Sequence, residues 1–154
     1  MQVFVSYSVA IDQLVALRLQ TLAAVYGLTV YVPPANTRQT IGAGLSKEVE
    51  NKLRESDVIL AVIMHEPAES AVSEMNWALA NGKLLIPIVS PSVAPDYYAR
   101  FKPNFVLDLN DPSKTESLIV NFLAEKQQAN HSTAALVALT TLALGLILFS
   151  SNSK

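Results

Sequence analysis

Glu74 is the side chain whose type and position best suit catalytic chemistry. It lies in SAVSEMNWALANGK, in the first turns of a predicted helix, with Gly82 eight residues further on. A carboxylate beside a crevice can stabilise positive charge that develops on a bound substrate. A structural role is the alternative, because Ser70 could cap this helix and the helix dipole favours an early acidic residue by up to about 1 kcal/mol. We expect Trp77, three residues on, to pack in the core.

Three other chemistries do not fit the sequence. A phosphorylated receiver domain needs acidic residues after its first strand and an Asp after its third. This chain has Ser6, Tyr7 and Ser8 at the first place, and Met64 followed by His65 at the second. A flavin or dinucleotide cradle would need a Gly-rich or hydroxyl-rich turn after the first strand, and acyl transfer a G-x-S-x-G motif. None of these patterns is present in the sequence.

The composition excludes further classes of ligand. The formal charge is -2 and the basic residues are scattered, so nothing indicates a nucleic-acid backbone as partner. The chain has no cysteine, which excludes disulfides, a thiolate nucleophile and Cys-based metal sites. Its histidines, His65 and His131, are too far apart in sequence to form a metal-spaced pair. We therefore expect neither nucleic acid nor a metal ion as ligand.

The elements that must position Glu74 alternate between strand and helix. Strands are predicted from apolar runs, and helices from apolar spacing and from Gly27 and Gly82 as stops. Apolar residues near helical spacing predict that the first helix is amphipathic and that two residues of the second share one face: Leu14, Leu17, Leu19 and Leu22, and Val49 and Leu53. The segment Asp57 to Met64 is apolar after its first residue, as expected for a central strand buried on both faces. The predicted strands are Gln2 to Tyr7, Leu28 to Val32, Asp57 to Met64, Leu84 to Val89 and Asn104 to Leu109, and the predicted helices Ala10 to Tyr26, Leu45 to Glu55, Ser70 to Asn81 and Ser113 to about Gln127.

This alternation predicts an α/β fold with a parallel sheet covered by helices on both faces. Five strands and four or five helices fit the flavodoxin-like strand order 2-1-3-4-5. In that order the ligand crevice lies beyond the carboxyl ends of the strands, at the switch point. We expect the site near Ser6 to Ser8, the loop from Pro33 to Gly44, and the start of the helix that carries Glu74.

The end of the chain is apolar. Residues 133–151, TAALVALTTLALGLILFSS, contain no charge and no Pro, and their length is close to the roughly 20 residues that span a bilayer. No polar stripe runs along them, which favours a transmembrane helix over a buried or oligomerising core helix. We predict a domain at 1–125, a linker at 126–132 and a transmembrane helix at 133–151.

Several segments, in order and at matching spacing, resemble a Toll/interleukin-1 receptor (TIR) domain of bacterial type over residues 1 to about 125. They are VFVSYSVAID with LVALRL, the loop containing Gly42 and Gly44, SDVILAVIM, and S-x-x-x-E followed by A-L-A-N-G-K-x-x-I-P-I. In the enzymatic branch of that family, a Glu eight residues before this G-K is the catalytic residue that cleaves NAD at the nicotinamide–ribose bond. The resemblance therefore implies that Glu74 is catalytic.

The resemblance also implies the substrate-binding residues. Ser6, Tyr7 and Ser8 would lie at the floor of the nucleotide cleft, and the loop from Pro33 to Gly44 would cover the cleft and mediate contacts between domains. The implied substrate-binding set is Ser6, Tyr7, Ser8, Arg38, Gly42 and Ser70. NAD enters as substrate, so no cofactor is expected.

Together these features predict a membrane-anchored protein that cleaves or cyclises NAD in antiphage defence or immune signalling. The domain would lie on the cytoplasmic side, because no signal peptide precedes it and NAD is intracellular. It would associate with itself through TIR contacts, and the anchor would cluster it in the membrane plane.

Two alternatives stay open. A non-catalytic adaptor acting by TIR–TIR association is favoured by Ser70, since many family members carry an aromatic residue there, and by Val32-Pro33-Pro34, where many carry an acid. A nucleoside 2-deoxyribosyltransferase-like enzyme has a similar E-x-x-x-A-x-x-x-G-K helix, with the Glu as nucleophile.

Overall fold

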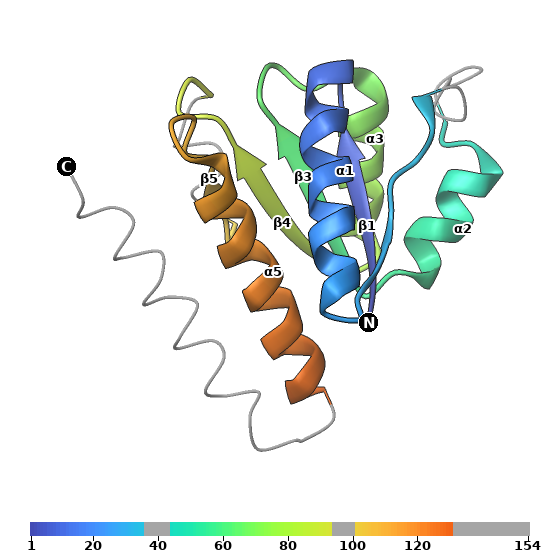
Figure 1. The fold of residues 1–154 in the computed structure, drawn as a ribbon. Coiled ribbons are helices and arrows are strands. Elements are labelled where there is room, and N and C mark those ends of the chain that lie inside the picture. Colours follow the sequence, from blue (N-terminus) through green and yellow to red (C-terminus); the bar gives the residue numbers. More distant parts are fainter. Residues whose placement is uncertain (36–43, 94–100, 131–154) are drawn as a thin grey trace.

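The computed structural model describes residues 1–35, 44–93 and 101–130, which form a five-stranded parallel sheet with helices on both faces (Figure 1). The strand order is β2-β1-β3-β4-β5, which confirms the predicted order 2-1-3-4-5. The strands are β1 (Gln2–Tyr7), β2 (Thr29–Tyr31), β3 (Val58–Ile63), β4 (Leu84–Val89) and β5 (Phe105–Val106), and the helices are α1 (Ala10–Val25), α2 (Lys47–Glu55), α3 (Glu69–Ala80) and α5 (Pro112–Ala129).

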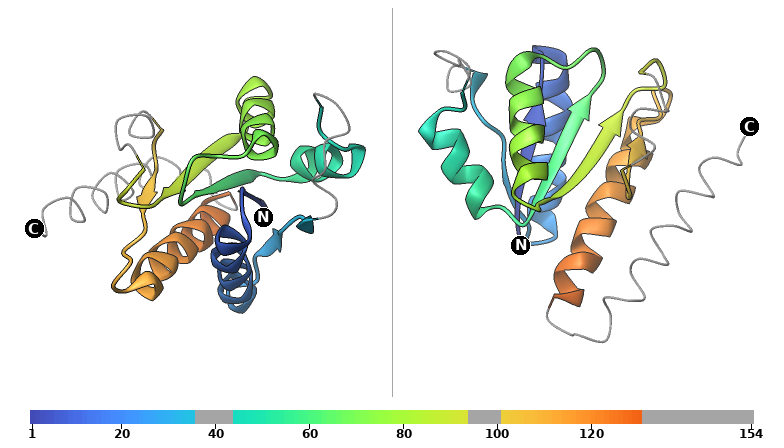
Figure 2. Two further views of the ribbon diagram at one scale, coloured as in Figure 1. Left: turned by 90° about the horizontal axis from the view of Figure 1, so that it is seen from above. Right: turned by 180° about the vertical axis from the view of Figure 1, so that it is seen from behind.

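The helices form two layers, with α1 and α5 on one face of the sheet and α2 and α3 on the other (Figure 2). Side chains of β1 alternate between these layers, as the strand pleat requires. Val3 and Val5 pack toward α1 and α5, and Phe4 packs toward α2 and α3. All six residues of β3 are buried, which confirms the expectation that the run around Asp57 to Met64 is a central strand.

The set of buried side chains in α1 differs in part from the sequence prediction. Of the leucines expected on the apolar side of this helix, Leu19 is buried and Leu22 is partly buried against the core. The other buried residues of α1 are Asp12, Ala16 and Ala23. Leu14 and Leu17 are exposed by 57% and 42%. Ala16 and Ala23 allow α1 to pack closely onto the sheet, whereas Leu14 and Leu17 point away from it.

Two helix starts show how local sequence sets the boundaries. The Ser46 hydroxyl accepts a hydrogen bond from the Val49 amide at 3.2 Å, so α2 begins at Lys47 rather than at Leu45. Val49 and Leu53 are both buried, which confirms that they share the inward face. Ser70 does not cap α3, since that helix begins at Glu69 and its N-cap residue is Ala68, with no side-chain cap.

The helix stops predicted from glycine are confirmed. Gly27 and Gly82 follow α1 and α3 with φ of +70° and +63°, the left-handed conformation that favours glycine after a helix. At the other end of the chain α5 continues to Ala129, so residues 126–129 of the predicted linker are helical. After Pro112 at its first position, α5 contains no Gly or Pro up to Ala129.

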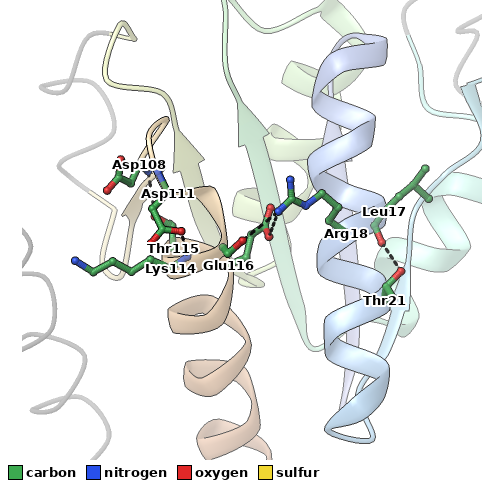
Figure 3. Close-up of polar contacts among 9 residues, drawn as sticks. Leu17, Arg18, Thr21, Asp108, Asp111, Lys114, Thr115 and Glu116 are labelled. Atoms are coloured by element: carbon green, nitrogen blue, oxygen red, sulfur yellow. Dashed lines mark hydrogen bonds and ion pairs between the residues drawn. The ribbon is translucent and has the colours of Figure 1, made fainter.

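Polar contacts fix α5 against α1 (Figure 3). Asp111 caps α5 by accepting from the Lys114 amide at 3.3 Å. Further along α5, the Glu116 carboxyl is 1% exposed and lies 3.0 Å from the Arg18 guanidinium of α1. Burial raises the pKa of Glu116 above its usual value, and the Arg18 charge and hydrogen bond act in the opposite direction.

The segment predicted to span a membrane, residues 133–151, lies outside the described residues. Within residues 1–35, 44–93 and 101–130, no helix has the length and apolar character that crossing a bilayer requires.

Candidate functional site

Ser6 and Glu74 meet at the carboxyl edge of the sheet. Ser6 lies two residues after Phe4 in β1, so the two side chains share one face of the sheet and Ser6 points toward α3. Glu74 belongs to the buried face of α3 with Ala71, Met75 and Ala78. The Ser6 hydroxyl donates a hydrogen bond to Glu74 Oε2, and both residues are 1% exposed. The fold therefore joins two residues that lie 68 positions apart in the sequence.

This pair explains how a carboxyl group can lie inside an apolar layer. A carboxylate removed from water requires hydrogen-bond donors, because an unsatisfied buried charge is strongly destabilising. Ser6, the second-to-last residue of β1, supplies one of these donors. Both residues sit next to β3, since β1 and β3 are neighbours at the switch point of the sheet. The pair therefore lies where this fold class binds ligands.

Tyr7 points to the opposite face of the sheet and belongs to the core cluster that includes α1 and α5. Its hydroxyl donates to the Pro33 carbonyl oxygen at 2.6 Å. Tyr7 thereby ties the end of β1 to the segment that follows β2. The strand pleat thus separates Ser6 from Tyr7, although the two are neighbours in sequence.

Ser8 connects the end of β1 to the start of α3. Its hydroxyl accepts a hydrogen bond from the Ala68 amide at 2.9 Å. Its own amide and that of Val9 donate to Asp12 Oδ2 at 3.3 and 3.4 Å. Asp12 is fully buried and holds the turn between β1 and α1, a role that sequence reasoning missed. An acidic residue at the third position of a helix is the signal that could have indicated it.

A pocket of about 200 Å³ opens beside these residues. It is bordered by Tyr7, Ser8, Val9, Ala10, Gln13, Ala35 and Ser70. The fold thus brings together Tyr7, Ser8 and Ser70 from the predicted set, and adds Gln13, which sequence reasoning did not single out. Ser6 and Glu74 lie outside the pocket lining, although Ser70 is one helical turn before Glu74.

The remaining predicted site residues, Arg38 and Gly42, lie outside the described residues. The pocket beside Tyr7 and Ser8 is smaller than the roughly 300–1,000 Å³ of sites for drug-sized ligands.

Trp77 is partly buried and packs against the core cluster between the sheet and the α2–α3 layer. This agrees with the expected core role of Trp77 rather than a role as a stacking platform for a ligand.

Comparison with solved structures supports the fold. A prokaryotic SEFIR domain aligns with a TM-score of 0.53 and 19% identity over 78% of this chain and 90% of its own. The sugar isomerase domain of an RpiR transcription factor from Sphaerobacter thermophilus aligns with a TM-score of 0.53 and 16% identity, over 95% of this chain and 77% of its own. No protein-family model and no curated protein matches the chain. The structural similarity shows a TIR-like α/β fold.

Proposed function

We propose that this protein is a membrane-anchored TIR-type enzyme that cleaves or cyclises NAD at the nicotinamide–ribose bond, with Glu74 as its catalytic residue. One observation carries the proposal: Ser6 hydrogen-bonds the Glu74 carboxyl at the carboxyl edge of a TIR-like sheet, next to a pocket that Tyr7, Ser8 and Ser70 border.

A single carboxylate is sufficient for this chemistry. When the bond between nicotinamide and ribose breaks, its electron pair leaves with nicotinamide, and positive charge develops on the ribose. Nicotinamide departs from a pyridinium as a neutral molecule, so no side chain has to donate a proton to it. The Glu74 carboxylate stabilises the ribosyl cation, and Ser6 orients that carboxylate. Attack by water gives ADP-ribose and a proton, whereas capture within the same molecule gives a cyclic isomer.

The substrate must replace contacts that now close the edge of the sheet. Glu74 is 1% exposed, and the Ser8 hydroxyl bound to the Ala68 amide lies between β1 and the start of α3. We propose that a ribose hydroxyl donates a further hydrogen bond to the Glu74 carboxylate, while Ser6 keeps the hydrogen bond that orients it. Arg38 and Gly42, in the loop after β2, would contact the remainder of NAD.

The proposed anchor is the uncharged segment at 133–151. Because α5 continues to Ala129, only a few residues separate the domain from this segment. A short tether would hold several copies in one plane and raise their effective concentration, which favours TIR–TIR association. NAD cleavage by clustered copies on a membrane would suit antiphage defence or immune signalling.

A non-catalytic adaptor is the second candidate. The burial of Glu74 favours it, because a carboxyl group that is 1% exposed and hydrogen-bonded by Ser6 can serve as a purely structural polar pair. A nucleoside 2-deoxyribosyltransferase-like activity is a further alternative that the same assay distinguishes.

The test is nicotinamide release from NAD by the full-length chain in detergent at high protein concentration. The comparison is between wild type, Glu74→Gln and the matched control Glu69→Gln, which changes an exposed Glu on the same helix. We expect Glu74→Gln to reduce release on the order of 10²-fold or more, and Glu69→Gln to retain it. Ser6→Ala should give an intermediate loss, because it leaves the carboxylate in place and removes its donor.

The alternatives predict different results. No release by wild type, with a folded and self-associating chain, supports the adaptor. Release that persists in Glu74→Gln shows that the site assignment is wrong. Base release from a 2-deoxynucleoside but not from NAD supports the transferase alternative. Separately, cell fractionation with and without residues 133–151 tests the anchor, and a full-length chain that stays in solution without detergent contradicts it.

A further inference from the structure

The outward side of α1 carries large apolar side chains that the rest of the described structure leaves exposed. Val25 is 81% exposed, and Leu14 and Ile11 are more than half exposed. The buried side of α1 consists of Asp12, Ala16, Leu19 and Ala23. We define the α1 outer face as Ile11, Leu14, Leu17, Val25 and the adjacent Tyr26. By helical spacing, Ile11, Leu14, Leu17 and Val25 fall on the side of α1 away from its buried residues, and Tyr26 is the C-cap residue that follows them.

The α1 outer face carries almost no charge. Arg18 is the ionisable residue among the exposed positions of α1, and its guanidinium is held by Glu116 at 3.0 Å and Ser113 at 3.4 Å (Figure 3). This ion pair turns the Arg18 charge toward α5. A solvent-facing side of a helix normally carries charged residues, so this one is unusual for a surface that faces water.

We propose that a second copy of this chain covers the α1 outer face. All five residues are at least 42% exposed, so their apolar side chains can supply much of the approximately 800 Å² that each partner contributes to a stable interface. Two such faces can meet without repulsion because neither has an unpaired charge. An acidic or basic partner would find no opposite charge there, and binding to a lipid surface would call for a row of Lys or Arg beside the apolar residues.

The position of this face links it to the candidate site. The first turns of α1 contribute Ala10 and Gln13 to the pocket, and Ile11 and Leu14 lie on the same turns. A copy bound through α1 therefore lies beside the pocket. This inference gives a surface to the self-association in the proposed function, but its test needs no NAD and its outcome does not depend on Glu74.

The absence of cysteine from the chain allows a direct experiment. Leu17→Cys places a single thiol on the α1 outer face, and Leu79→Cys places one on α3, in the opposite layer, at a similar exposure of 47% against 42% (Figure 2). Both full-length variants are treated with a short bismaleimide in detergent. Leu79→Cys is the control, because it carries the same C-terminal segment. Its yield of covalent dimer measures the cross-linking that arises only because two chains share one micelle.

We expect several-fold more covalent dimer from Leu17→Cys than from Leu79→Cys. Adding Leu14→Glu to Leu17→Cys should return the yield to the control value and raise the dimer Kd about tenfold or more, because it places a carboxylate in the interface. Equal yields from the two single-cysteine variants overturn the inference. Equal yields are also expected if residues 133–151 or lipid, rather than a second copy of the chain, cover the α1 outer face. Unchanged thermal unfolding of each variant confirms that it is folded.

Discussion

Removal of the Arg18 guanidinium provides a test of how α5 is held against α1. Glu116 is 1% exposed, and Arg18 is the cationic side chain that reaches it, at 3.0 Å (Figure 3). Arg18→Met keeps most of the apolar stem and removes the charge and the hydrogen bond. Because Arg18 is itself 54% exposed, solvent screening reduces the loss below that for a fully buried pair. We expect the free energy of unfolding to fall by about 1–2 kcal/mol at neutral pH.

The pH dependence follows from the direction of the pKa shift. Burial raises the pKa of Glu116, and Arg18 lowers it, so Arg18→Met raises this pKa further. A raised pKa means that the native state holds the proton more readily than the unfolded state. The contribution of Glu116 to stability is therefore fully present below the usual carboxyl pKa and is lost as pH rises through the native pKa. The effect of Arg18→Met should be smallest near about pH 4 and largest above neutrality.

The assay is urea unfolding of wild type and variants across this pH range, at one protein concentration. Glu116→Gln supplies the matched background, since glutamine can still accept from Arg18 but does not ionise. On that background Arg18→Met should cost about 0.5–1 kcal/mol, the loss of a hydrogen bond alone, and this cost should not change with pH. A loss in the presence of Glu116 that is independent of pH, or a loss equal on both backgrounds, would refute the ion-pair reasoning.

Two further predictions concern the segments that border the candidate site. Tyr7→Phe removes the hydroxyl that donates to the Pro33 carbonyl and should cost about 1–2 kcal/mol in urea unfolding, whereas Tyr26→Phe, at a tyrosine that is 51% exposed, should change stability by less than about 0.5 kcal/mol. Ser46→Ala removes the α2 cap and should cost about 1 kcal/mol, while Ser46→Asp should retain most of the stability; equal losses would contradict the capping role.

Sequence periodicity was sufficient for the alternation of strands and helices and for the ends of several elements. The bounds of β1 and β4 agree with those predicted, and Gly27 and Gly82 end the helices that they were expected to end. These features depend on local physics, namely buried apolar runs and the freedom of glycine at positive φ. The resemblance to TIR domains agrees with the TIR-like fold shown by structural comparison.

Contacts between distant segments were less accessible to sequence reasoning. Periodicity placed Leu14 and Leu17 on an apolar stripe of α1, but it could not show that Ala16 and Ala23 would be the residues packed onto the sheet. Ser70 had the chemistry of an N-cap, yet the N-cap residue of α3 is Ala68, two residues earlier. These differences arise because close packing, rather than residue type alone, selects the buried side and the entry point of a helix.

The sequence by itself determined the α/β alternation, the position of Glu74 in the first turns of a helix and the uncharged run at 133–151. Only the tertiary structure decided that Ser6 donates to Glu74 while Tyr7 points to the other face, and that Arg18 reaches Glu116. The physical reason is that local propensity and periodicity act over a few residues. A buried carboxyl group instead takes its donors from whichever segments the sheet order brings beside it.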